Sequence, residues 1–334
     1  MIFLWVVVLA RLRFAIPKGS LEKATYDFLE KAMIKIYGRE RSYRPTTNDP
    51  ELQLKILRPQ EIPIYVSEGL YDLGITGLDW VLETNADVKI LLDLEYGNVN
   101  LVVAVPKTVN VNSLNELIEL HYSSGKILRI STEYPSLVSR YVSNLPKYKE
   151  FYGTNNPTVI TPWWKVGENS FVHIYLSFGA TEAKPPDEAD AIVDISETGT
   201  TLEQNGLKPL DVVLRSSAIL IANKSSLNDL NKREKIYDVV ALFRGVIESG
   251  KKFHIFVNVR EENLKELLQV LPALKGPTVS PLSKPGWYAV NTVIDRTDYM
   301  RLLPKLRKLA QGLVVHEPQL IMPLEDIAKE ENGE

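Results

Sequence analysis

Short apolar runs alternate with stretches of helical spacing in the first part of the chain. Residues 12–16, 52–57 and 73–76 are apolar runs of strand length, whereas 21–36 repeats apolar positions every three or four residues. Residues 17–20 form a turn between the first strand and this helix. The alternation favours a parallel sheet covered by helices, in which ligands bind at the carboxyl ends of the strands.

A second set of alternating elements follows. The run 101–105 ends at Pro106, and we assign it as the last strand before the second lobe. We therefore predict a first lobe over residues 1–105, completed by returning apolar runs within 203–225, and a second lobe over 106–202. The second lobe contains predicted strands at 127–131, 172–176 and 191–195 and a predicted helix at 136–142.

The chain after residue 226 has a different rhythm. A long leading helix at 232–249 is followed by strand, helix, strand, strand, helix, strand, which is the βαββαβ order of a ferredoxin-like α+β domain. We therefore predict that 226–334 is a separate domain. Pro304 lies inside the last predicted helix and predicts a kink there. The predicted strands of this domain are 253–259, 278–282, 287–294 and 312–315.

The first ten residues are apolar without interruption. This run is too short to span a bilayer, and its basic residues, Arg11 and Arg13, follow the apolar run rather than precede it as in a secretory signal. We interpret residues 1–10 as an extra strand or as the result of a misassigned start, and we expect a cytoplasmic protein.

Composition narrows the possible chemistry. The 334 residues carry a net charge of -3 and no cysteine, which excludes disulfides, thiolate metal sites and cysteine nucleophiles, and disfavours general nucleic-acid binding. The four histidines are scattered without ligand spacing, so we interpret them as structural.

A hydroxyl-rich segment after a buried strand is the most informative candidate site. The strand delivers Asp194 to its carboxyl end, and Ser196, Thr198, Gly199, Thr200 and Thr201 form the loop before a helix near Leu202. Free backbone N–H groups, hydroxyls and the helix dipole suit a phosphate, and Gly199 permits close approach. A hydroxyl-rich helix cap without a ligand remains the alternative.

Two aspartates belong to the same candidate site. Asp190 and Asp194 are four residues apart in the strand and therefore share a face, where we expect them to hold ribose hydroxyls or Mg²⁺ on a pyrophosphate.

Several cations follow strands of the first lobe. Lys18 and Gly19 lie in the first strand-to-helix loop, while Arg41, Arg44 and Arg58 add guanidinium groups suited to phosphate. For each of them a solvated surface side chain remains the alternative.

Two other features leave alternatives open. Thr76 and Gly77 end a buried strand, where they permit close approach of an adenine or ribose, although a tight turn explains them equally well. Trp163 and Trp164 lie in a loop that suits either stacking on a base or packing between domains.

Taken together and in order, these segments resemble the ATP phosphoribosyltransferase family in its long form. The catalytic motifs are RFAIPKGSL at 13–21, LRPQEIP at 57–63, DLGITG at 72–77, STEYP at 131–135, GATE at 179–182 and ADAIVDISETGTTL at 189–202, and the tail motif is PTVSPL at 277–282 followed by GWYAV at 286–290. Each motif is short, but seven in the family's order are specific.

The resemblance implies an α/β fold: a two-lobed periplasmic-binding-protein-like (type II) catalytic core followed by the ferredoxin-like regulatory domain. It implies the first step of histidine biosynthesis, in which N1 of ATP attacks C1 of phosphoribosyl pyrophosphate and pyrophosphate leaves, with Mg²⁺ present. It also implies feedback inhibition by histidine and a homohexamer built from dimers.

Residue roles follow by position in the family motifs. Asp194, Thr198, Gly199, Thr200 and Thr201 hold the 5-phosphate and ribose, with Asp194 also a candidate metal ligand. The other implied assignments are Lys18, Arg41 and Arg58 facing the phosphates of ATP and of the leaving pyrophosphate, Glu182 orienting the exocyclic amine, Gly19, Ser20, Thr76, Gly77 and Asp190 contacting substrate, and Leu274, Thr278 and Ser280 contacting histidine.

This chain departs from the family where Ser20 follows Lys18 and Gly19, since many members have arginine there. The alternative function is a two-lobed small-molecule binding protein without chemistry, and a third is an enzyme-like regulatory subunit. Lys18, Arg41 and Arg58 favour the enzyme, because a binding protein has no reason to combine them with a phosphate loop.

Overall fold

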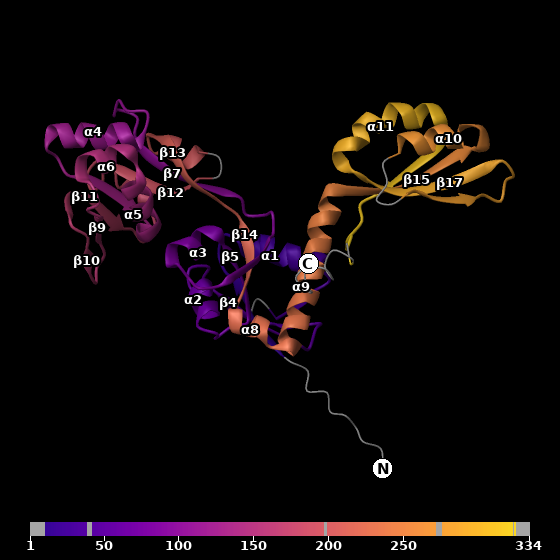
Figure 1. Cartoon of the computed structure of the whole chain (residues 1–334), viewed down its shortest axis with the longest axis horizontal. Coiled ribbons are helices and arrows are strands. Elements are labelled where there is room, and N and C mark those ends of the chain that lie inside the picture. Colours follow the sequence, from indigo (N-terminus) through magenta and orange to yellow (C-terminus); the bar gives the residue numbers. More distant parts are fainter. Residues whose placement is uncertain (1–10, 39–41, 197–198, 272–275, 323, 325–334) are drawn as a thin grey trace, which may run out of the picture. The chain divides into compact units, whose positions relative to one another are not determined.

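A computed structural model describes residues 11–38, 42–196, 199–271, 276–322 and 324 (Figure 1). The interpretation of residues 1–10 therefore lies outside the described part, as do the roles expected of Arg41, Thr198 and Leu274. The chain divides into two compact units. One consists of Arg13–Ala24 and Leu54–Ser226, and the other of the chain up to Leu12, Thr25–Gln53 and the chain from Leu227 onward. Each is described by itself.

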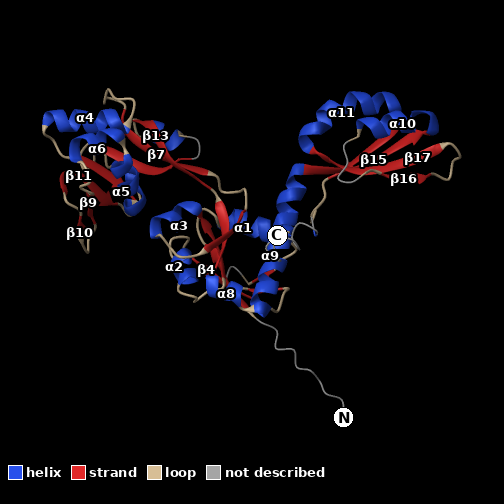
Figure 2. Cartoon of the chain, in the orientation of Figure 1, coloured by secondary structure: helices blue, strands red, loops and turns tan. Residues whose placement is uncertain are grey.

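The first lobe is built on a five-stranded sheet of order β4-β1-β5-β14-β6 (Figure 2). β1 and β5 are parallel and almost fully buried, as their continuous apolar runs predict. The strands are β1 (Leu12–Pro17), β4 (Leu52–Leu57), β5 (Leu73–Gly77), β6 (Lys89–Asp93) and β14 (Ala218–Ala222); the helices are α1 (Glu22–Lys31), α2 (Ile62–Ser67) and α3 (Leu78–Thr84).

The helix predicted to reach residue 36 ends at Lys31. Met33 has a φ of 63°, which takes the backbone out of the helical region. The apolar residue Ile36 then begins the short strand β2 (Ile36–Tyr37), which pairs with β3 (Thr46–Thr47). Apolar spacing alone did not reveal this turn.

The second lobe contains a seven-stranded sheet of order β10-β9-β11-β8-β12-β7-β13. Its core includes Ile130, Val172 and Val193 from the sheet, with Leu117 and Val138 from the covering helices. The strands are β7 (Val99–Pro106), β8 (Leu128–Thr132), β9 (Pro157–Ile160), β10 (Lys165–Val166), β11 (Asn169–Leu176), β12 (Ala191–Ser196) and β13 (Leu207–Ser216); the helices are α4 (Leu114–Ser124), α5 (Pro135–Asn144), α6 (Pro146–Tyr152), the 3-10 turn η1 (Thr181–Ala183) and α7 (Thr200–Gln204).

The boundary predicted at residue 105 is wrong. β7, which we assigned to the first lobe, pairs antiparallel with β12 and β13 in the second sheet. Of the two returning runs, β13 joins the second sheet and only β14 enters the first, antiparallel between β5 and β6. An apolar run shows that a strand is buried, but not in which sheet.

The tail forms an antiparallel sheet of order β16-β17-β15-β18 with helices packed on one face, as the βαββαβ pattern predicts. Helix α11 continues over Pro304. The elements are α8 (Lys224–Asn228), α9 (Leu230–Lys251), β15 (Lys252–Arg260), α10 (Glu261–Val270), β16 (Thr278–Pro281), β17 (Trp287–Asp295), α11 (Arg296–Leu309) and β18 (Ala310–His316).

Helix α9 packs against α1 in the unit that they share. Phe28 and Phe243 meet edge to face with ring centroids 5.1 Å apart. Lys235 Nζ lies 2.7 Å from a carboxylate oxygen of Asp49 and 2.7 Å from one of Glu51. The helix leading into the tail is therefore attached to α1 and to the turn before β4.

Candidate active site

Two loops with cationic side chains meet at the carboxyl edge of the first sheet. The Lys18 N–H donates to the Leu57 carbonyl at 2.8 Å, so the loop after β1 is tied to the loop after β4. Gly19 has a φ of +90°, and a Cβ there would lie 3.9 Å from Nη1 of Arg58. The Arg58 guanidinium therefore lies beside the glycine loop, where a phosphate would meet both loops.

The turn into α1 begins at Gly19 rather than at Ser20. The Gly19 N–H donates to the Glu22 carboxylate at 3.3 Å, and the Glu22 N–H donates to the Gly19 carbonyl at 3.0 Å. This reciprocal pair resembles a capping box, with Glu22 in the position of its acidic residue.

Thr76 and Gly77 are buried at the end of β5. The Thr76 hydroxyl donates to the Pro59 carbonyl at 2.8 Å and so fixes the loop that begins with Arg58. A Cβ on Gly77 would lie 2.1 Å from Oδ1 of Asp79, so only glycine fits there. The structure gives both residues a supporting role, and their contact with substrate remains a prediction.

The carboxyl edge of the second sheet is acidic. Asp194 near the end of β12 accepts the Ile195 N–H at 2.7 Å. Partial burial raises the pKa of Asp194 to about 6, and the negative charges of Glu133 and Glu182 add to the shift. Asp194 and Glu182, which the sequence predicted separately as site residues, are brought together because η1 lies against β12.

Glu133 belongs to this cluster but was missed by sequence reasoning. It follows β8 directly and accepts a hydrogen bond from the Gly179 backbone, while burial raises its pKa. Two signals in the sequence could have found it: its position after a buried strand that neighbours β12, and its place in the segment STEYP at 131–135.

The loop after β12 has the openness that a phosphate needs. Gly199 has a φ of +80°, no heavy atom lies within 4 Å of the point that a Cβ would occupy, and its N–H donates to the Ser196 hydroxyl at 3.0 Å. Thr200 and Thr201 are exposed. Helix α7 has only 5 residues, so its dipole contributes little to anion binding. A phosphate here would be held by the hydroxyls and backbone N–H groups of the loop.

Asp190 is separated from Asp194 by the strand. It precedes β12, and its carboxylate accepts the Arg129 backbone N–H at 2.8 Å and Nη2 at 2.9 Å. Our assignment of Asp190 to the ribose or to Mg²⁺ therefore does not fit the structure, because its carboxylate is bound to Arg129 at the opposite edge of the sheet.

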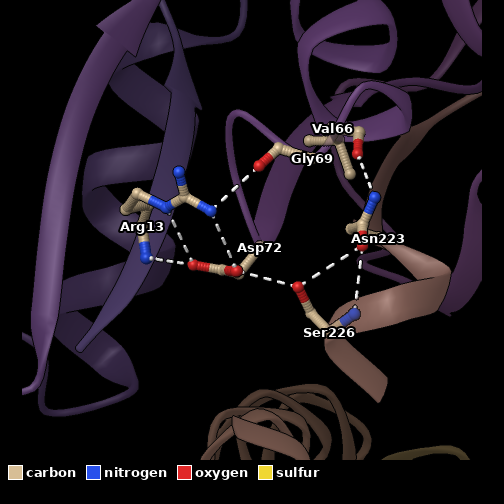
Figure 3. Close-up of polar contacts among 6 residues, drawn as sticks. All are labelled: Arg13, Val66, Gly69, Asp72, Asn223 and Ser226. Atoms are coloured by element: carbon tan, nitrogen blue, oxygen red, sulfur yellow. Dashed lines mark hydrogen bonds and ion pairs between the residues drawn. The ribbon is translucent and has the colours of Figure 1, made fainter. Parts of the chain in front are cut away.

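The first lobe repeats this arrangement at its own amino edge (Figure 3). Asp72 accepts the Arg13 backbone N–H at 2.8 Å and Nε at 3.3 Å, and it also accepts the Ser226 hydroxyl at 2.8 Å. The Asn223 amide donates to the Val66 carbonyl at 2.8 Å. These contacts attach the segment after β14 to the first sheet, away from the candidate site.

Several contacts join the carboxyl edge of the first sheet to that of the second. Their residues come shortly after Gly77 and Glu133 in the sequence. The Tyr134 hydroxyl donates to Asp79 at 2.8 Å, and the Tyr134 ring lies 4.4 Å from that of Trp80. Glu83 accepts the backbone N–H groups of Ser136 at 2.9 Å and of Leu137 at 2.7 Å at the start of α5. Glu133 is therefore held beside the junction of the lobes.

Thr278 and Ser280 lie on one face of the tail sheet. Their register places them opposite Asn291 and Ala289, on the face away from the helices. The side-chain oxygen Oδ1 of Asn291 lies 2.7 Å from Nε2 of His254 on the same face. The contact of Thr278 and Ser280 with histidine remains a prediction.

Within the described ranges, no group of three or more histidine, aspartate or glutamate side chains is placed to hold a metal ion. Asp194 therefore offers one carboxylate rather than a metal cage. No helix in the part of the chain that the structure describes has the length and apolarity needed to cross a bilayer.

Comparison with known proteins identifies the family. The family model ATP phosphoribosyltransferase matches residues 58–245, and the model of the HisG C-terminal domain matches 250–317. The ATP phosphoribosyltransferase of Solibacter usitatus is 39% identical, covering 92% of this chain and 97% of that protein. That of Pelotomaculum thermopropionicum is 36% identical, covering 92% and 98%.

Among solved structures, the ATP phosphoribosyl transferase (HisG:HisZ) complex from Thermotoga maritima aligns with a TM-score of 0.54 and 27% identity, covering 71% of this chain and 98% of that one. The relatives span nearly their whole length in the alignment, and both family models match in order. The chain belongs to the ATP phosphoribosyltransferase family, in the long form that carries the C-terminal domain.

Proposed function

We propose that this chain transfers the phosphoribosyl group of phosphoribosyl pyrophosphate to N1 of ATP through the residues at the two carboxyl edges. The observation that carries the proposal is the hydrogen bond between Tyr134 and Asp79. It joins an edge that presents Lys18 and Arg58 to one that presents carboxylates and an open glycine loop. One edge suits phosphates and the other suits a sugar.

The reaction needs little covalent chemistry from the protein. The C1–O bond to pyrophosphate breaks, and its electron pair leaves with pyrophosphate, while the N1 lone pair of adenine forms the new bond to C1. Lys18 and Arg58, with Arg41, neutralise the charge that develops on the leaving group. The proton given up afterwards comes from the exocyclic amine, which Glu182 orients.

The second lobe holds the sugar. Gly199, Thr200 and Thr201, with Thr198, bind the 5-phosphate through hydroxyls and backbone N–H groups. Asp194 accepts hydrogen bonds from ribose hydroxyls, for which it must be ionised. Mg²⁺ enters as part of the substrate, bound to its pyrophosphate, because the described residues offer no metal cage.

The matched C-terminal domain supports feedback regulation. We propose that histidine binds it through Thr278 and Ser280, together with Leu274, and lowers turnover. A homohexamer and a cytoplasmic location complete the proposal, and both follow from the family resemblance.

Mixing ATP, phosphoribosyl pyrophosphate and Mg²⁺ with the protein tests the function through the absorbance of the N1-substituted product. We expect product to form only with all three, and histidine to slow it. Binding of both substrates without product would instead favour the two-lobed binding protein, which family membership and the cation set disfavour.

A further inference from the structure

Two large aromatic side chains are exposed at the end of the second sheet. Trp163 is 72% exposed and Phe178 is 70% exposed. Their rings meet edge to face with centroids 5.9 Å apart and planes at 85°. Large aromatic side chains are usually buried, so a pair that is mostly exposed is a candidate contact surface.

Trp163 is presented by a closed turn. The Thr161 hydroxyl accepts the N–H groups of Trp163 at 3.2 Å and of Trp164 at 3.1 Å, and the Thr161 N–H donates to the Trp164 carbonyl at 3.0 Å. The turn joins β9 to β10 at the carboxyl end of β9. The exposure of the indole therefore comes from a hydrogen-bonded turn with a defined backbone.

A continuous series of contacts connects this pair to the acidic cluster. Phe178 lies between Ser177 and Gly179; the Ser177 hydroxyl donates to the Gly179 carbonyl at 3.1 Å and accepts from the Thr181 hydroxyl at 3.3 Å. Thr181 in turn is hydrogen-bonded to Asp194. The aromatic pair therefore borders the proposed sugar site.

We propose that Trp163 and Phe178 form the platform on which the purine ring of the nucleotide substrate stacks. This inference rests on the proposed function and adds the group that holds the base. Of the charged residues described above, Lys18 and Arg58 are assigned to phosphates and Asp194 to ribose, which every nucleotide shares, and Glu182 is assigned to the exocyclic amine alone, so none of them fixes the plane of the ring. An aromatic platform at the border of the sugar site fixes that plane.

Trp164 provides a matched control in the same turn. It is 47% exposed, and among the residues that the structure describes it forms no ring pair. Trp164→Ala removes an indole from the same turn and leaves both Trp163 and Phe178 in place.

The experiment compares steady-state kinetics of Trp163→Ala, Trp163→Phe, Trp164→Ala and Phe178→Leu. We expect Trp163→Ala to raise KM for ATP about 5- to 100-fold, the loss typical of one base–aromatic contact, with KM for phosphoribosyl pyrophosphate unchanged. Trp163→Phe should restore most of the loss, Phe178→Leu should share it, and Trp164→Ala should stay close to the parent chain.

Inorganic tripolyphosphate, which carries phosphates without a ring, separates the base from the phosphates. Its inhibition constant should be the same for Trp163→Ala and the parent chain. Equal KM for ATP in the Trp163 and Trp164 variants would overturn the platform, as would a Trp163→Ala effect confined to the oligomeric state in sedimentation.

The proposed function is tested apart from the platform by equilibrium dialysis of ATP against the parent chain and Trp163→Ala. If the parent makes no product yet binds ATP more tightly than the variant, the transfer reaction fails and the platform stands. If both bind equally, the platform fails.

Discussion

The amino and carboxyl edges of the two sheets use the same residue types in opposite ways. At each amino edge, an arginine in the second position of a central strand binds the aspartate that precedes the neighbouring strand: Arg13 with Asp72, and Arg129 with Asp190. At the carboxyl edges, Arg58 forms no ion pair within the described ranges, and Asp194 faces other carboxylates. Paired charges stabilise the fold, whereas charges left without a counter-ion mark the site.

The largest effect should come from removing a carboxyl-edge cation. Arg58→Ala should lower kcat/KM about 100- to 1000-fold, because a positioned donor to the leaving group is lost. The thermal stability should change little. Arg215→Ala, at an exposed arginine of β13, is the control and should remain near the parent value. An Arg58 variant with turnover within two-fold of the parent would contradict the assignment of the site.

The amino edge should respond in stability instead. Asp72→Ala should lower the free energy of unfolding by about 2 kcal/mol, since it leaves the Arg13 backbone N–H and the buried Ser226 hydroxyl without their acceptor. Asp190→Ala should cost less, because the Asp190 side chain is 23% exposed and that of Asp72 only 1%. Urea unfolding measures both.

Activity per folded molecule should survive in both of these variants. A loss of kcat in Asp190→Ala with unchanged stability would restore Asp190 to the substrate site and break the distinction between the edges.

Asp194→Asn should raise the free energy of unfolding, whereas the amino-edge variants lower it. The pKa of Asp194 rises from 3.8 to about 6 on folding, so the folded chain binds this proton more tightly, and ionisation makes folding less favourable as pH rises through that window. The neutral amide removes this cost. We expect the variant to gain about 2 kcal/mol at pH 7.5 and nothing near pH 4, while turnover falls.

Thermal melts of the Asp194 variant and the parent chain at the two pH values measure this difference. Destabilisation at pH 7.5 would show that Asp194 is part of the supporting structure rather than held ready for a ligand.

The smallest effect concerns the pH profile. The acidic limb of kcat/KM should follow Asp194, which must be ionised to accept from ribose. Glu133→Gln removes a neighbouring negative charge and should move that limb to lower pH by less than about one unit. Glu188→Gln, outside the set of groups that shift Asp194, should leave the limb in place. A shift of the limb to higher pH in Glu133→Gln would contradict the interaction between Glu133 and Asp194.

Sequence periodicity predicted the tail well because each of its elements carries its own hydrophobic pattern and the elements follow the order of a known motif. Strands β15 and β17, for example, begin within a residue of the predicted 253 and at the predicted 287. The sheet membership of β7 and β13 could not be predicted, because pairing across the chain leaves no trace in a single apolar run.

In the candidate site too, the sequence predicts local features better than contacts between distant segments. Lys18 and Arg58 each follow a strand of the first sheet, and their loops meet as those positions predict. Asp190 was misassigned because two residues four apart in a strand share a face but lie about 13 Å apart along it, which leaves Asp190 at the amino end of β12. Glu133 was missed because its partners, Gly179 and Asp194, come from distant segments.

The exchange of strands between the sheets affects how the chain folds as it is made. β14 sits between β5 and β6, yet it is synthesised only after the whole second lobe. At typical ribosomal speeds of about 5–20 residues per second, β6 waits roughly ten seconds for β14, its neighbour in the described sheet. During nascent-chain synthesis the edge of β5 that β14 will occupy therefore stays unpaired until the chain has passed Ala222.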